Sequence, residues 1–172
     1  MYNRVAKGYP FELPPLPYPY DALEPFLDEQ TMRLHHDKHH QDYIDGLNQA
    51  IEALEDARTN QDYEFVQYWQ RQLSFHWAGH RNHTLLWDSM GPPQESDEPL
   101  GSLRQEIDRN FDSLQAFRRH FVEAALSVEG SGWAMVCFDP TTNLLEIETV
   151  QNHQHSFPPG LQPILPVDVW EH

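Results

Sequence analysis

The stretch DEQTMRLHHDKHHQDYIDGLNQAIEALED, residues 28–56, predicts the element on which the fold depends. It contains no proline and a single glycine, Gly46, and its apolar and aromatic side chains recur at three- and four-residue intervals. This periodicity is typical of an amphipathic helix. We expect His35, His39 and Tyr43 to lie along one face of that helix, each one turn from the next.

A second helical stretch, residues 62–86, places apolar and aromatic side chains in a similar register. The motif Met90-Gly91-Pro92-Pro93 ends it, because glycine and proline interrupt helices. Only a short connection separates the two stretches. We therefore expect them to form an antiparallel helical hairpin.

Two shorter helices are predicted in the second half of the chain, at residues 102–111 and 113–126. Serine is a favoured N-cap residue, so Ser102 and Ser113 are the expected caps. The motif Gly130-Ser131-Gly132 follows them and interrupts the helical pattern.

Three strand-like stretches complete the chain, at residues 133–138, 144–150 and 163–168. The third contains prolines, which cannot donate a ladder hydrogen bond, so we expect it at a sheet edge. The predicted fold class is α+β. An N-terminal helical-hairpin domain, residues 1–97, precedes a C-terminal α/β domain, residues 98–172, with a small three-stranded antiparallel sheet.

The composition narrows the class of protein. A formal net charge of −16 argues against a nucleic-acid partner, which would require a basic face. The single cysteine, Cys137, excludes an intrachain disulfide and lies in an apolar run, so we interpret it as core packing. We find no signal peptide at the N-terminus and no apolar run long enough for a membrane span. A cytoplasmic protein is expected.

A metal site is suggested by the last five residues, Asp168-Val169-Trp170-Glu171-His172. A carboxylate and an imidazole lie four positions apart there, and further imidazoles are present in the clusters at residues 35–40 and 80–83. One carboxylate and several neutral imidazoles form a ligand set that suits iron, manganese or zinc.

Spacing alone leaves other interpretations open. The histidine cluster at residues 35–40 could be a solvated, pH-sensitive face, since it contains no HExxH pattern. A zinc hydrolase on a similar ligand set lacks a candidate general base. The sequence has no GxSxG motif and no glycine-rich loop between a strand and a helix, so acyl transfer and nucleotide binding lack support.

Four segments closely resemble the iron/manganese superoxide dismutase family. They are LPPLPYPYDALEPFLDEQTMRLHHDKHHQDYIDGLNQA at 13–50, AGHRNHTLLW at 78–87, EGSGWAMV at 129–136 and PILPVDVWEH at 163–172. They occur in the order typical of the family, and the resemblance extends over essentially the whole chain from Tyr9 onward.

The resemblance implies one iron or manganese ion per chain, with solvent as a fifth ligand. The protein ligands that it implies are His35, His83, Asp168 and His172. His39 and Tyr43 match the pair of residues at the mouth of the substrate funnel. Members of the family carry an aromatic shell around the metal, which matches Trp87, Trp133 and Trp170. Glu171 matches the glutamate that contacts the partner subunit, so the resemblance implies a homodimer formed through the metal-site face.

His153 matches the position that hydrogen-bonds the metal-bound solvent, where many members carry glutamine. Because the chain combines His153 with Gly79, it is similar to a subgroup that includes iron-using and metal-tolerant enzymes. The resemblance therefore does not decide between iron and manganese. Four other histidines match no catalytic role, and we expect them to be surface or packing residues: His36, His40, His76 and His155.

The implied activity is dismutation of two superoxide anions to dioxygen and hydrogen peroxide by an oxidoreductase. Superoxide is an anion, so local cations must offset the acidic charge of the protein, and Lys38 and Arg81 are the candidates. Family members continue beyond the residue that matches His172, so we expect the C-terminal helices to be missing. The alternative is a truncated, catalytically impaired metal-binding or interaction protein of the same fold.

Overall fold

The computed structural model describes residues 9–93 and 98–171, and the chain divides into two compact units, Met1–Thr84 and Leu85–His172. The predicted α+β class is confirmed, with helices in the first unit and a three-stranded antiparallel sheet in the second. The domain boundary at residue 97 stays a proposal, because that residue lies outside the described residues.

The first long helix consists of three consecutive parts, which are α1 (Glu29–Arg33), the π-helix η1 (Leu34–His40) and α2 (Gln41–Asn60). Asp28 caps it, since its Oδ1 accepts a hydrogen bond of 2.7 Å from the Thr31 amide. Gln61 ends it in the left-handed region, with φ of 54°. The predicted helix is therefore confirmed. The π-helical turn was not expected, although such turns are frequent at functional sites.

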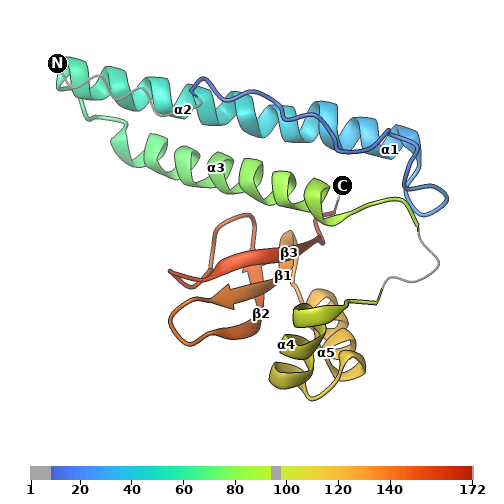
Figure 1. Cartoon of the computed structure of the whole chain (residues 1–172). Coiled ribbons are helices and arrows are strands. Elements are labelled where there is room, and N and C mark those ends of the chain that lie inside the picture. Colours follow the sequence, from blue (N-terminus) through green and yellow to red (C-terminus); the bar gives the residue numbers. More distant parts are fainter. Residues whose placement is uncertain (1–8, 94–97, 172) are drawn as a thin grey trace. The chain divides into compact units, whose positions relative to one another are not determined.

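One face of this long helix is buried. The side chains that face the interior are Met32, Ile44, Leu47, Ala50 and Leu54. The buried His36 and His40 fill the interval between Met32 and Ile44, so the buried positions recur every three or four residues, as predicted from the sequence. The second helix of the hairpin, α3, extends over Val66–Ser89, and Figure 1 shows it running beside α2 in the opposite direction. Both helices therefore form the predicted hairpin.

The proline-rich segment at residues 9–20 runs extended along the first long helix (Figure 1). Asn48 holds it through two hydrogen bonds of 2.9 Å, one from the Phe11 amide and one to the Phe11 carbonyl. His36 donates from Nε2 to the Pro14 carbonyl at 2.9 Å. These side chains satisfy backbone groups that an extended segment cannot pair within itself.

Two helices precede the sheet in the second unit, α4 (Gly101–Phe111) and α5 (Leu114–Leu126). Ser113 caps α5 as predicted, since its hydroxyl accepts from the Ala116 amide at 3.1 Å. The prediction that Ser102 caps α4 is wrong. The extended backbone ends at Leu100, and Gly101 takes a positive φ of 60°, so Ser102 already lies inside the helix.

The sheet has the order β2-β1-β3, with β1 at Gly132–Asp139, β2 at Leu144–Gln151 and β3 at Gln162–Asp168. Its proline-containing strand β3 lies at an edge, as predicted. The central strand β1 is buried over most of its length. A core cluster packs the sheet against α4 and α5, and its buried members are Ile107, Leu114, Phe117, Val136 and Leu145.

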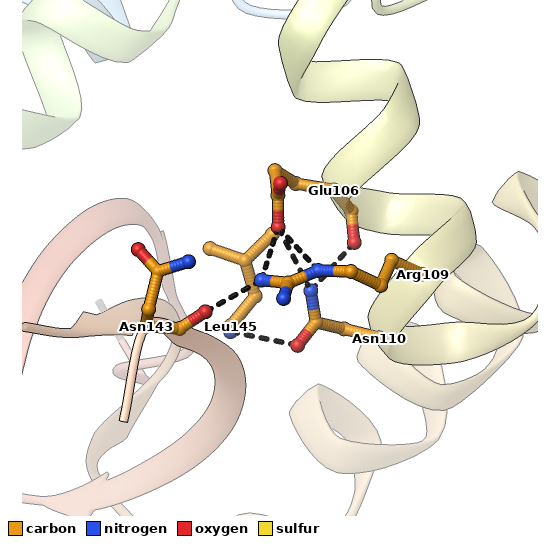
Figure 2. Close-up of polar contacts among 5 residues, drawn as sticks. All are labelled: Glu106, Arg109, Asn110, Asn143 and Leu145. Atoms are coloured by element: carbon orange, nitrogen blue, oxygen red, sulfur yellow. Dashed lines mark hydrogen bonds and ion pairs between the residues drawn. The ribbon is translucent and has the colours of Figure 1, made fainter. Parts of the chain in front are cut away.

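Polar contacts attach α4 to the hairpin between β1 and β2 (Figure 2). The Arg109 guanidinium donates to the Asn143 carbonyl at 2.6 Å, and Asn110 accepts from the Leu145 amide at 3.1 Å. The two residues of each bond are separated in sequence by one helix, α5, and one strand, β1. These bonds fix the end of α4 on the sheet that carries the C-terminal candidate residues.

Cys137 is fully buried in β1, and burial raises the pKa of its thiol to about 12. A thiol that stays protonated is a poor nucleophile. The interpretation of Cys137 as a packing residue is therefore supported.

Candidate metal centre

Two histidines from the opposite helices of the hairpin meet through their Nε2 atoms. His35 lies in η1 and His83 in α3, and their Nε2 atoms are 3.0 Å apart. His83 is fully buried, and its Nδ1 lies 2.7 Å from the Gly79 carbonyl oxygen. Because a carbonyl only accepts, Nδ1 carries a proton, and Nε2 is the nitrogen whose lone pair a metal ion could take from the neutral ring. This orientation is the usual one for a metal-binding histidine.

The spacing of these two nitrogens fits one metal ion. Nitrogens about 2.1 Å from a first-row ion such as zinc lie about 3 Å apart when the angle at the ion is near 90°. The 3.0 Å between His35 and His83 matches that value. Neutral imidazoles are also donors that iron and manganese accept. The hairpin histidines therefore fit the ion that the sequence implies.

Tyr43 lies beside this histidine pair. Its ring centroid is 5.1 Å from that of His83 and 5.8 Å from that of Phe75. Gly79 of α3 faces the ring so closely that a Cβ there would lie 2.6 Å from Tyr43 Cδ1. His39 is half-buried in η1, with its ring 6.3 Å from that of His35. The rings of His35 and His39 are thus neighbours on the first long helix, and Tyr43 lies beside the His35–His83 pair, although η1 is π-helical.

A buried imidazole pair lies behind His83. His40 Nε2 and His80 Nδ1 are 2.9 Å apart, and the His40 ring stacks on those of His80 and His83. Burial, with smaller contributions from neighbouring histidines, lowers the pKa of His40 to about 3. Burial also lowers the pKa of His80. Both rings are therefore neutral at pH 7, and the expected role of His40 as a packing residue is supported.

A second group of candidate residues lies at one end of the sheet. Asp168 ends β3 and is paired with Trp133 of β1 in the sheet register. The Asp168 Oδ1 accepts from the Trp170 amide at 2.9 Å. The Trp170 ring stacks on His153, with 4.4 Å between centroids and 12° between planes. This unit therefore brings together two of the three predicted tryptophans, Trp133 and Trp170, with the carboxylate and His153.

His153 is buried, and its tautomer follows from one hydrogen bond. The Trp133 indole Nε1 lies 3.0 Å from His153 Nδ1. Since an indole N–H can only donate, Nδ1 must accept, and the neutral ring carries its proton on Nε2. His153 is therefore prepared to donate a hydrogen bond from Nε2.

The remaining predicted residues are placed as follows. Trp87 is buried in α3, and Glu171 is exposed after β3. His172, the fourth expected ligand, lies outside the described residues. The structure thus presents the candidate residues as two local groups, one in the hairpin and one at the end of the sheet.

The contacts that surround Tyr43 were not predicted from the sequence. His76 is a packing residue, as expected, and its ring lies against Gly46 and near Tyr43. The only sequence signal was a glycine inside each long helix, Gly46 and Gly79. An internal helix glycine often marks a close approach by another element.

Comparison with known proteins identifies the two halves of the chain. Residues 10–91 match the family described as iron/manganese superoxide dismutases, alpha-hairpin domain, and residues 99–172 match the C-terminal domain of the same family. The chain is 47% identical over 160 residues to a probable superoxide dismutase [Fe] of Bacillus subtilis. That match covers 93% of this chain and 57% of the Bacillus protein.

Two archaeal proteins are similar over more of their own length. A superoxide dismutase [Fe] of Methanothermobacter marburgensis is 44% identical over 94% of this chain and 81% of its own length. A superoxide dismutase [Mn/Fe] of Aeropyrum pernix is 43% identical over 94% of this chain and 76% of its own length. With both domain matches in order, the chain belongs to the iron/manganese superoxide dismutase family.

Proposed function

We propose that this chain converts two superoxide anions to dioxygen and hydrogen peroxide with one iron or manganese ion. Its family and the names of its relatives make it an oxidoreductase of the superoxide dismutase type. The alternative of an impaired metal-binding or interaction protein is not favoured, because the relatives are named as superoxide dismutases.

The proposed ligands of the ion are His35, His83, Asp168 and His172. The observation that carries this assignment is the pair of Nε2 atoms 3.0 Å apart, with the His83 proton held on Nδ1 by the Gly79 carbonyl. When bound, the ion supplies a one-electron couple between its 2+ and 3+ states. The carboxylate of Asp168 adds one negative charge to the neutral imidazoles, which suits a divalent or trivalent ion.

The protein residues around the proposed site supply hydrogen bonds and protons. Peroxide formation consumes two protons, so the site needs groups that can donate and be reprotonated. Tyr43 and His39 are our candidates for that route on the hairpin side. His153 is the candidate on the sheet side, because its Nε2 carries the proton. The hydrogen bond from Trp133 keeps that proton on Nε2, a dependence typical of residues around metal sites.

We also propose a cytoplasmic homodimer in which Glu171 contacts the partner subunit, without nucleic acid or membrane as a partner. The exposure of Glu171 and the acidic net charge support this proposal. Among the described residues, none of the helices is both long and apolar enough to cross a membrane.

Reconstitution of the purified chain with iron and with manganese, separately, tests the proposal. Metal content and superoxide turnover are measured on the same samples. Turnover should scale with bound metal, and H83A should lose both, whereas H155A, which changes an exposed histidine, should keep both. A folded wild-type protein that binds metal without turnover would instead support the impaired relative.

A further inference from the structure

We propose that His76 is a positioning residue for Tyr43, holding the phenol ring in one orientation beside the histidine pair. This inference rests on the proposed function, in which Tyr43 takes part in proton delivery. Three observations carry it: the contact between His76 and Gly46, the neighbours of the Tyr43 ring, and the hydrogen bonding of the His76 imidazole.

The first observation is a tight contact between the two long helices of the hairpin, which lie side by side in Figure 1. A Cβ built on Gly46 of α2 would lie 2.3 Å from Cε1 of His76, and both ring nitrogens of His76 would be 2.5 Å away. The imidazole therefore occupies the space that any larger residue at position 46 would need. Gly46 follows Tyr43 by three residues, which places this space one helical turn from the phenol.

The second observation is the set of neighbours around the Tyr43 ring. His76 contributes a ring whose centroid is 6.1 Å away and whose plane is tilted by 53°. Phe75 and His83 contribute two further rings at 5.8 Å and 5.1 Å, and Gly79 allows the backbone of α3 to approach. Packed interiors hold a ring in one rotamer when its neighbours fill the alternatives. His76 fills the side of the phenol toward Gly46.

The third observation concerns how His76 itself is held. Gln72, one turn earlier on α3, places Oε1 at 3.2 Å from His76 Nε2. Because an amide oxygen accepts, Nε2 donates and the neutral ring keeps a lone pair on Nδ1. That Nδ1 atom is buried and has no hydrogen-bond partner among the described residues. Burial also lowers the pKa of His76, so the ring contributes no positive charge beside Tyr43 at pH 7.

A simple core histidine would share these contacts but would act on stability alone. The two roles are separated by a double-mutant cycle on turnover. H76A should lower turnover at saturating superoxide about three- to tenfold, because small displacements of catalytic groups are costly. In a Tyr43→Phe background, which lacks the hydroxyl, H76A should change turnover less than twofold. H76F keeps the ring volume and should restore most of the rate. H155A is the matched control.

A second readout does not depend on activity. In metal-free protein labelled with [¹³Cζ]-tyrosine, the Tyr43 resonance is assigned by its absence in Y43F. H76A should shift or broaden that resonance and leave the resonances of the distant tyrosines in place. H76F should shift or broaden the Tyr43 resonance less than H76A does. This measurement remains decisive if wild-type protein shows no turnover, which would refute the proposed function instead.

The proposal is overturned by either of two results. One is an equal loss of turnover on H76A with and without the Tyr43 hydroxyl, at unchanged metal content. The other is a Tyr43 resonance that H76A leaves unchanged. If H76A does not fold, the same comparisons are made with H76F and H76L, and an H76L protein with the turnover and the Tyr43 resonance of wild type overturns the proposal.

Discussion

Replacing Gly79 by alanine should destabilise the protein, although alanine favours helices more than glycine does. A Cβ at position 79 would lie 2.6 Å and 2.7 Å from Cδ1 and Cγ of Tyr43, whereas ordinary contacts are 3.4–4 Å. The phenol ring would therefore have to move by almost 1 Å, roughly the difference between these distances. Overpacking of this kind costs about 1–3 kcal/mol.

The gain from helix propensity opposes this cost. Alanine is favoured over glycine in a helix interior by about 1 kcal/mol. The net expectation for G79A is a loss of about 1 kcal/mol of unfolding free energy, from the overpacking range less the propensity gain. In a Tyr43→Ala background the ring is absent, so the same change should stabilise by about 1 kcal/mol. The effect of G79A on the unfolding free energy should therefore change from destabilising to stabilising when the Tyr43 ring is removed.

The double-mutant cycle consists of wild type, G79A, Y43A and the double variant, all metal-free. Their unfolding free energies are measured by urea unfolding, followed by far-ultraviolet circular dichroism at one protein concentration. The coupling energy between positions 43 and 79 should be about 2 kcal/mol. Gly91 has no atom within 4 Å of a built Cβ, so G91A is the control with little expected change. Equal effects of G79A with and without the Tyr43 ring would refute the reasoning.

Three further predictions follow from other contacts. Asn48→Ala removes both hydrogen bonds to Phe11 and should cost about 1–3 kcal/mol of unfolding free energy, measured with urea. His40 has a pKa of about 3 when folded and near 6.5 when unfolded, so acid favours the unfolded chain. Stability should fall as pH drops below 6.5, with His40 alone contributing about 2 kcal/mol between pH 7 and pH 5. Lys38→Glu reverses an exposed charge 3.4 Å from Asp42 and should slow turnover at low ionic strength, with the difference vanishing in high salt.

Each of these three predictions would be contradicted by one particular result. For Asn48, the contradiction is an unfolding midpoint equal to that of wild type. For His40, it is a pH dependence of stability that His40→Gln leaves unchanged in metal-free protein. For Lys38, it is a turnover rate in low salt that charge reversal does not alter.

Local patterns in the sequence predict the main helices and strands and their order. The spacing of His39, Tyr43 and Leu47 predicts the first long helix, because helical periodicity depends only on neighbours three and four residues away. The prolines of β3 predict an edge strand, because a missing N–H is a property of the residue itself. The family is likewise readable from local motifs such as DVWEH at residues 168–172.

The way in which the candidate side chains are held depends on packing between distant segments of the chain. The His153 tautomer depends on Trp133, which is twenty positions away in sequence. His35 and His83, whose Nε2 atoms meet, are forty-eight positions apart. His76 acquires its place against Gly46 only when the helices pack. Ser102 was misassigned as a cap because α4 begins after Leu100, whose side chain makes no cap hydrogen bond, so residue preference did not mark the start of this helix. Such contacts join distant parts of the chain, so no local pattern encodes them, and packing decides their geometry.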